Sequence, residues 1–131
     1  MNFLIDHNLR GHAVLLLGSI LSSSWLHWVP IRFITFDEME LPIDSDDRAV
    51  WQPAQSNQMI LLTANRSMKG GNSLEQLMRE EVTSTSLPVI TLGDADRLLN
   101  DFQYRERCTT RLVEIVLDLD SYKGVSRFFI P

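Results

Sequence analysis

The sequence predicts a three-layer α/β/α sandwich built on a mainly parallel, five-stranded sheet. Short apolar segments alternate with segments of helical periodicity along the chain, which is the pattern of repeated β-α-β units. Most of the strand-like segments are continuous apolar runs, as expected of strands that are covered on both faces. The chain has 131 residues, 44% of them hydrophobic. This length suits one compact core, so we expect a single domain spanning residues 1–131.

Five segments are predicted to be strands because they are rich in β-branched, aromatic and other apolar residues. The first ends at an acidic residue, and the third is apolar until its last residue, Thr63. The sequence does not fix the order of the strands in the sheet. The predicted strands are residues 2–5, 31–36, 59–63, 88–92 and 125–130.

Helices are predicted between the strands. Pro53 is expected to kink or shorten the second of them, because proline lacks a backbone N–H. A further helix containing Leu98, Leu99 and Phe102 follows the fourth strand, and a long amphipathic helix extends from Arg105. The expected caps are Asn8 for the first helix, Asp46 or Asp47 for the second, and Asn72 or Ser73 for the third.

The net charge of −5 argues against a protein that binds nucleic acid by charge alone. Any anionic substrate would have to be met by a local basic patch or by bound cations. The only cysteine, Cys108, excludes a disulfide framework and a cysteine-rich zinc site. The longest nearly apolar run, residues 13–21, is shorter than the roughly 20 residues that a bilayer requires. We therefore expect a cytoplasmic protein with no membrane partner.

Acidic residues follow or precede several of the predicted strands. Asp6 ends the first strand, Asp94 and Asp96 follow the fourth, and Asp47 begins the helix before the third. Ligands of open α/β sheets bind outside the carboxyl ends of the strands, so these groups are expected to cluster there. Clustered carboxylates suit Mg²⁺ or Mn²⁺, which can activate water and stabilise a transferring phosphoryl group. The pattern indicates metal-dependent phosphodiester hydrolysis.

Helix capping is the alternative interpretation of most of these acids. Asp47, Asp94 and Asp96 all stand where an aspartate commonly caps the next helix. Asp6 is different, because Asn8 is better placed to cap the first helix. Asp6 is therefore the acid that is hardest to explain by capping.

Three segments resemble the motifs of the small PIN-like domains. Residues 3–9 are similar to their opening strand, which ends in an aspartate, here Asp6. Residues 47–54 resemble the second motif, in which Asp47 starts a helix with an apolar residue and an alanine at set positions. Residues 60–66 resemble the third, an apolar strand followed by threonine, any residue and an acid. The matches occur in the family's order and extend from residue 3 to about residue 68.

PIN-like proteins are mostly metal-dependent ribonucleases, and many are toxins of bacterial toxin–antitoxin pairs. The resemblance implies that Asp6 and Asp47 are metal ligands and that RNA is the substrate. Asn65 stands where the family has its third acid, and an amide oxygen can coordinate Mg²⁺ without adding charge. Asp94 or Asp96 is expected to replace the missing charge. The expected catalytic residues are Asp6, Asp47, Asn65 and Asp94, and the expected metal ligands are Asp6, Asp47, Asp94 and Asp96.

Basic and hydroxyl side chains near this site could contact the phosphates of the substrate, although for the basic ones solubility is the alternative role. These residues are Arg10, Thr63, Arg66 and Lys69. Asn65 also leaves open a catalytically inactive PIN-like module that acts through a protein partner, such as an antitoxin, or as a homodimer. A receiver-like signalling domain is a third possibility, but it would need an aspartate where Asn65 stands.

Overall fold

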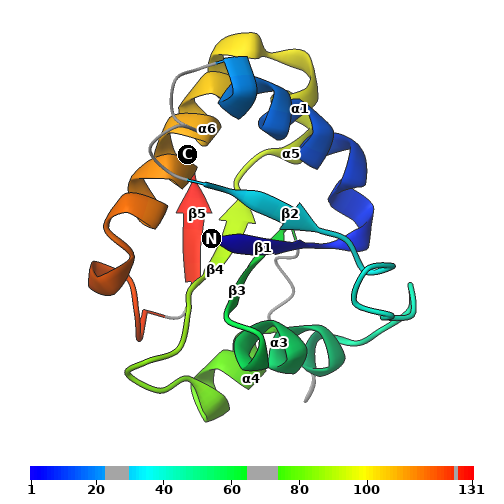
Figure 1. Ribbon diagram of the computed structural model, residues 1–131, viewed down its shortest axis with the longest axis vertical. Coiled ribbons are helices and arrows are strands. Elements are labelled where there is room, and N and C mark those ends of the chain that lie inside the picture. Colours follow the sequence, from blue (N-terminus) through cyan, green and yellow to red (C-terminus); the bar gives the residue numbers. More distant parts are fainter. Residues whose placement is uncertain (23–29, 65–73, 126) are drawn as a thin grey trace.

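Figure 1 shows the computed structural model of the chain, which describes residues 1–22, 30–64, 74–125 and 127–131. A five-stranded, all-parallel sheet lies at its centre, with helices on both faces. All five predicted strands are confirmed, with shorter ends in three cases. They are β1 (Asn2–Ile5), β2 (Arg32–Ile34), β3 (Met59–Thr63), β4 (Val89–Leu92) and β5 (Arg127–Ile130).

The strand order is β2-β1-β3-β4-β5, the order of flavodoxin-like doubly wound sheets. In the register, Leu4 of β1 lies opposite Ile34 of β2 on one side and Leu61 of β3 on the other. The chain leaves β1 for β2 on one side and then crosses to β3 on the other side. The carboxyl ends of β1 and β3 therefore flank the point where the strand order reverses, which is where such sheets bind ligands.

Two separate apolar clusters cover the two faces of the sheet, because successive strand residues point to opposite sides. Phe3 and Ile5 of β1 belong to the cluster under α1 (Arg10–Ser22), α5 (Ala95–Asn100) and α6 (Phe102–Leu117). Leu4 belongs to the cluster under α3 (Asp47–Ser56) and α4 (Leu74–Glu81). These clusters confirm the three-layer α/β/α arrangement. The short helices η1 (His7–Leu9) and η2 (Leu119–Ser121) complete the described elements.

The caps differ from the expectations in instructive ways. Asp46 caps α3 as predicted, since its side chain accepts the Ala49 N–H at 2.8 Å. The prediction that Asn8 is a cap is wrong, because η1 begins directly after Asp6 and Asn8 lies inside it. Helix α3 continues past Pro53 to its last residue, Ser56. The predicted caps at residues 72 and 73 lie outside the described residues.

A break at Asp101 divides the helix that was predicted to contain Leu98, Leu99 and Phe102. Asp101 has an extended backbone (φ −122°, ψ 107°), and its side chain accepts the Tyr104 N–H at 3.1 Å. Helix α5 therefore ends at Asn100, and Phe102 begins α6.

Helix α6 carries the only cysteine of the chain on its buried side. Cys108 is fully buried in the cluster under α1, α5 and α6. This burial raises the pKa of the Cys108 thiol to about 11. In the described part of the chain, none of the helices combines the length and apolar character needed to cross a bilayer.

Candidate functional site

A pocket of about 400 Å³ opens at the carboxyl ends of β1 and β3. It lies where the strand order reverses, between the segment after β1 and the start of α3. Its apolar wall includes Phe36, Ile43 and Val50. The polar side chains among its described lining residues are Asp6, Asn8, Ser45, Asp47 and Thr63.

Asp6 is fixed to the neighbouring strand by its backbone and by its side chain. Its N–H donates to the carbonyl oxygen of Leu62 at 3.0 Å, which extends the pairing of β1 and β3 by one residue. Its Oδ2 atom accepts a hydrogen bond from Oγ1 of Thr63 at 2.8 Å. Thr63 is 2% exposed, so a buried hydroxyl orients this half-buried carboxylate toward the pocket.

Asp47 reaches the same pocket from the first turn of α3. The neighbouring Asp46 caps this helix, so the two adjacent acids have different structural positions. A carboxylate in the first turn of a helix is stabilised by the helix dipole. Two ion pairs connect α3 to α4: Arg48 of α3 lies 3.6 Å from Glu80 and 2.6 Å from Glu81 of α4. Asp6 and Asp47, from two distant segments, thus line one cavity.

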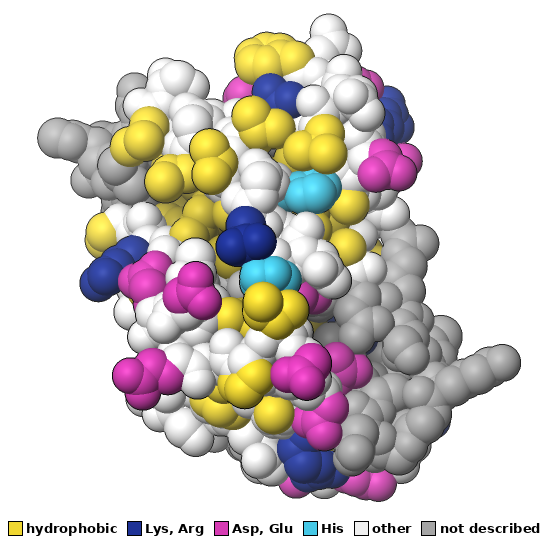
Figure 2. Space-filling view, turned by 90° about the vertical axis from the view of Figure 1, so that its right-hand side faces the viewer, with side chains coloured by type: hydrophobic (Ala, Val, Ile, Leu, Met, Phe, Trp, Pro, Cys, Tyr) yellow, Lys and Arg dark blue, Asp and Glu magenta, His cyan; other side chains and the backbone are white. Residues whose placement is uncertain are grey.

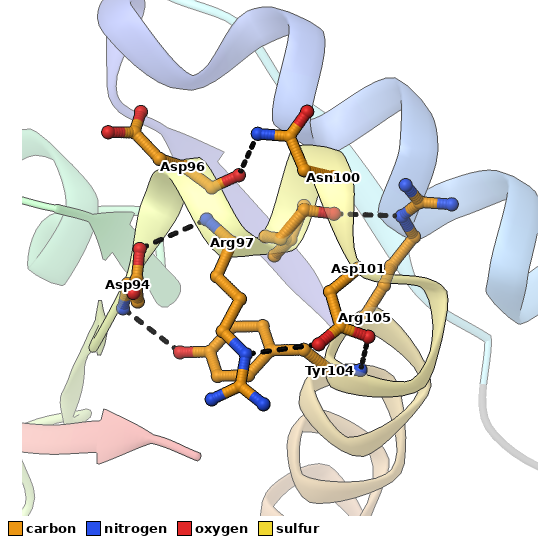
Figure 3. Close-up of polar contacts among 8 residues, drawn as sticks. Asp94, Asp96, Arg97, Asn100, Asp101, Tyr104 and Arg105 are labelled. Atoms are coloured by element: carbon orange, nitrogen blue, oxygen red, sulfur yellow. Dashed lines mark hydrogen bonds and ion pairs between the residues drawn. The ribbon is translucent and has the colours of Figure 1, made fainter.

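Asp94 and Asp96 are not among the residues that line this pocket. Figure 3 shows the interactions of Asp94 at the corner between β4 and α5. Its Oδ1 atom accepts the Arg97 N–H at 3.0 Å, and its own N–H donates to the Tyr104 hydroxyl at 2.9 Å. Strand β3 also separates β4 from β1. The geometry gives Asp94 a capping role, and the metal-ligand role of Asp94 and Asp96 remains a prediction.

The predicted substrate-binding residues are only partly described. Thr63 lies in the pocket, whereas Arg10 is exposed at the start of α1 and is not among the lining residues. Asn65, Arg66 and Lys69 lie outside the described residues. Their roles remain predictions.

The chemistry of the described donors suits a hard cation. Carboxylates, hydroxyls and an amide supply oxygen ligands, and Mg²⁺ and Mn²⁺ prefer oxygen. Among the residues that the structure describes, no three His, Cys, Asp or Glu side chains come together as a metal-binding group. The described part of the site therefore offers two carboxylates, Asp6 and Asp47, together with neutral oxygen donors.

Two polar lining residues were not expected at the site from the sequence. Asn8 was assigned to capping, and Ser45 was given no role; it lies within residues 37–47, which have six acids and no Lys or Arg. The Ser45 hydroxyl donates to the Pro42 carbonyl oxygen at 2.6 Å, which closes the turn before α3. The position of Ser45 directly before the capping Asp46 is the only sequence signal that could have indicated its place.

No family model, curated protein or solved structure matches this chain. The assignment of a function therefore depends on the pocket and on the residues that line it.

Proposed function

We propose that this chain is a PIN-like hydrolase that cleaves RNA phosphodiesters with Mg²⁺ or Mn²⁺ bound at Asp6 and Asp47. The observation that carries the proposal is that these two carboxylates, from the end of β1 and the start of α3, line one pocket. Two carboxylates that share a pocket repel each other unless a cation lies between them. The remaining polar donors in the pocket are neutral oxygens, which fit the same ions.

The motifs that resemble the PIN-like family support this proposal. Asp6, Asp47 and Thr63 occupy corresponding motif positions in the sequence and line the same pocket in the fold. The all-parallel sheet is compatible with a PIN-like domain. Asn65, at the family's third acidic position, would contribute an amide oxygen. By the same resemblance, the chain would act in the cytoplasm as a bacterial toxin with an antitoxin partner.

The reaction would be hydrolysis of a phosphodiester. The oxygen of water forms a bond to phosphorus, and the bond from phosphorus to the leaving oxygen breaks, which yields a phosphomonoester and a hydroxyl group. A bound Mg²⁺ or Mn²⁺ lowers the pKa of a coordinated water and offsets the charge on the phosphoryl group. Asp6 and Asp47 are the described lining residues that can accept the proton that water loses. The Thr63 hydroxyl keeps the carboxylate of Asp6 in place for this role.

The experiment compares two adjacent acids. In an assay of RNA cleavage with Mg²⁺ or Mn²⁺, we expect activity that a chelator removes. Asp47→Asn should lower the rate at least about 100-fold, because it removes one of the two charges that hold the cation. Asp46→Asn is the matched control and should keep the rate, because asparagine also caps helices. Equal rates for the two variants, or cleavage that is unaffected by the chelator, would refute the proposal.

The second candidate function is a non-catalytic PIN-like module that acts through a protein partner. It is favoured by exposed apolar residues on α1, where Val14 is 70% exposed and Leu21 is 58% exposed. Figure 2 shows hydrophobic side chains gathered in the upper part of the face on which α1 lies. A chain that cleaves no RNA with either ion would favour this candidate.

A further inference from the structure

The pocket has an apolar rim residue, Ile43, beside the two carboxylates. Ile43 is 68% exposed, whereas the neighbouring wall residues Phe36 and Val50 are 4% and 7% exposed. A single exposed isoleucine is ordinary on a protein surface. An exposed isoleucine that lines a pocket is a different case, because a ligand in that pocket would cover it.

Hydrogen bonds hold the loop that carries Ile43. The Leu41 N–H donates to the Phe36 carbonyl oxygen at 2.9 Å, and the turn at residues 42–45 is closed by both the N–H and the hydroxyl of Ser45. Ile43 lies inside this closed turn. The backbone that carries Ile43 is therefore ordered by the loop, so little backbone freedom is left to lose on binding.

The charges around the pocket indicate what kind of contact a nucleotide needs there. None of the described lining residues is Lys or Arg. The loop itself, residues 37–47, has six acids and no Lys or Arg. A phosphate group approaching the described part of the pocket meets negative charge, so the cation and apolar contacts must supply the affinity. Among the apolar lining residues, the exposed Ile43 offers such a contact to a flat nucleobase.

We infer that Ile43 contacts the nucleobase of the nucleotide bound at this site, and thereby determines how strongly the site binds its substrate. This inference rests on the proposed function. The pocket volume of about 400 Å³ falls in the range of pockets that hold one small ligand. Contacts with the face of a base depend little on the base sequence, because every base has a π-face.

The test uses two ligands that differ only in the base. With methyl-labelled isoleucine and saturating Mg²⁺, adenosine 5′-monophosphate should shift the Ile43 methyl resonance in NMR spectra, since an aromatic base changes the local field. Ribose 5-phosphate, which has the same sugar and phosphate, should leave that resonance in place. The fully buried Ile90 is the internal control and should not move with either ligand.

Two variants quantify the contact. Ile43→Ala should raise the dissociation constant of adenosine 5′-monophosphate about 10-fold, the cost of losing a few methyl and methylene contacts, and should leave that of ribose 5-phosphate unchanged. Val14→Ala, which shortens an equally exposed aliphatic residue on α1, should change neither constant by more than about 2-fold.

The outcomes separate this inference from the proposed function. If the wild type cleaves RNA but Ile43 shifts equally with both ligands or with neither, the base contact is wrong and the hydrolase stands. If the base-dependent shift occurs without any cleavage of RNA, the hydrolase is wrong and the base contact stands. If Ile43→Ala leaves binding unchanged, the rim residue serves another purpose, such as contact with a protein, and the inference is overturned.

Discussion

The carboxyl ends of β1 and β4 each carry an aspartate, and the two ends are built differently. Asp6 after β1 receives a side-chain hydroxyl and lines an open pocket. Asp94 after β4 receives a backbone N–H and lies in the corner that Tyr104 closes. The difference teaches that the partner of a strand-end carboxylate indicates its role. A backbone partner serves the fold, whereas a side-chain partner next to a cavity leaves the carboxylate oriented toward a ligand.

The corner at β4 is also tightly packed. A Cβ atom added at Gly93 would lie 3.2 Å from the carbonyl oxygen of Pro131 and 3.4 Å from the Tyr104 hydroxyl. The Gly93 N–H donates to the Ile130 carbonyl oxygen at 2.8 Å. Packed atoms therefore fill the space at the carboxyl end of β4, whereas a pocket is open at the carboxyl ends of β1 and β3.

The largest expected effect comes from deleting one hydroxyl at each end. Tyr104→Phe should lower the free energy of unfolding by about 1–2 kcal/mol, because the part-buried hydrogen bond from the Asp94 N–H loses its acceptor, the hydroxyl of the 4%-exposed Tyr104. Thr63→Val should cost less stability, because water can replace the lost donor at the half-buried Asp6. Urea denaturation measures both free energies.

The same two variants should have the opposite order in an assay of RNA cleavage. Thr63→Val should lower the rate because Asp6 is no longer oriented, and Tyr104→Phe should leave it unchanged. If Tyr104→Phe lowers the rate more than Thr63→Val, the distinction between the two ends is wrong.

A smaller effect is expected from metal binding. Mn²⁺ at ten times its dissociation constant should stabilise the wild type by about 1.4 kcal/mol, which corresponds to a rise in Tm of roughly 5 °C for a domain of this size. Asp6→Asn should remove most of this rise, and Asp94→Asn should keep it. Calorimetry in the presence and absence of Mn²⁺ measures the rise. A loss of the rise in Asp94→Asn would instead assign Asp94 to the metal site.

The smallest expected effect is the pH dependence of the Tm that arises from Asp101, next to the corner between β4 and α5. The Tyr104 N–H, with help from the Arg97 side chain, lowers the pKa of Asp101 below 3.8. Since the pKa is lower in the folded chain, the charged Asp101 contributes stability above pH 3.8 that is lost as the pH falls through the folded pKa. The Tm of the wild type should therefore fall more steeply below pH 3.8 than that of Asp101→Asn, which caps α6 without titrating. Parallel Tm curves between pH 6 and pH 2 would contradict this expectation.

Much of the fold could be predicted from the sequence because its signals are local. Apolar runs specified all five strands, and the Asp46 cap followed from its position before a helical pattern. Two helices were predicted here, but the position of the break at Asp101 could not be, because the apolar periodicity assigned Phe102 to the same helix as Leu98 and Leu99. It depends on the Asp101 side chain accepting the Tyr104 N–H and on Arg105 donating to the Leu98 carbonyl oxygen at 3.0 Å.

The candidate site was harder to predict, because capping and ligand binding use the same residue type. The sequence indicated Asp6, Asp47 and Thr63, which the structure brings to one pocket. It set Asp6 apart from the capping candidates but could not separate Asp47 from Asp94, because the strand order decides which strand ends are neighbours. Nothing in the sequence indicated that Ile43 belongs to the site. An isoleucine in an acidic loop becomes a candidate for ligand contact only when the structure shows that the loop borders a cavity.

Because Cys108 lies on the buried side of α6, its reactivity can report how often α6 separates from the sheet. Its thiol is fully buried and, with a pKa of about 11, stays protonated at neutral pH. A thiol in that state reacts slowly with alkylating reagents. Alkylation of Cys108 therefore requires α6 to separate from the sheet. The alkylation rate of the native chain measures the frequency of these local openings.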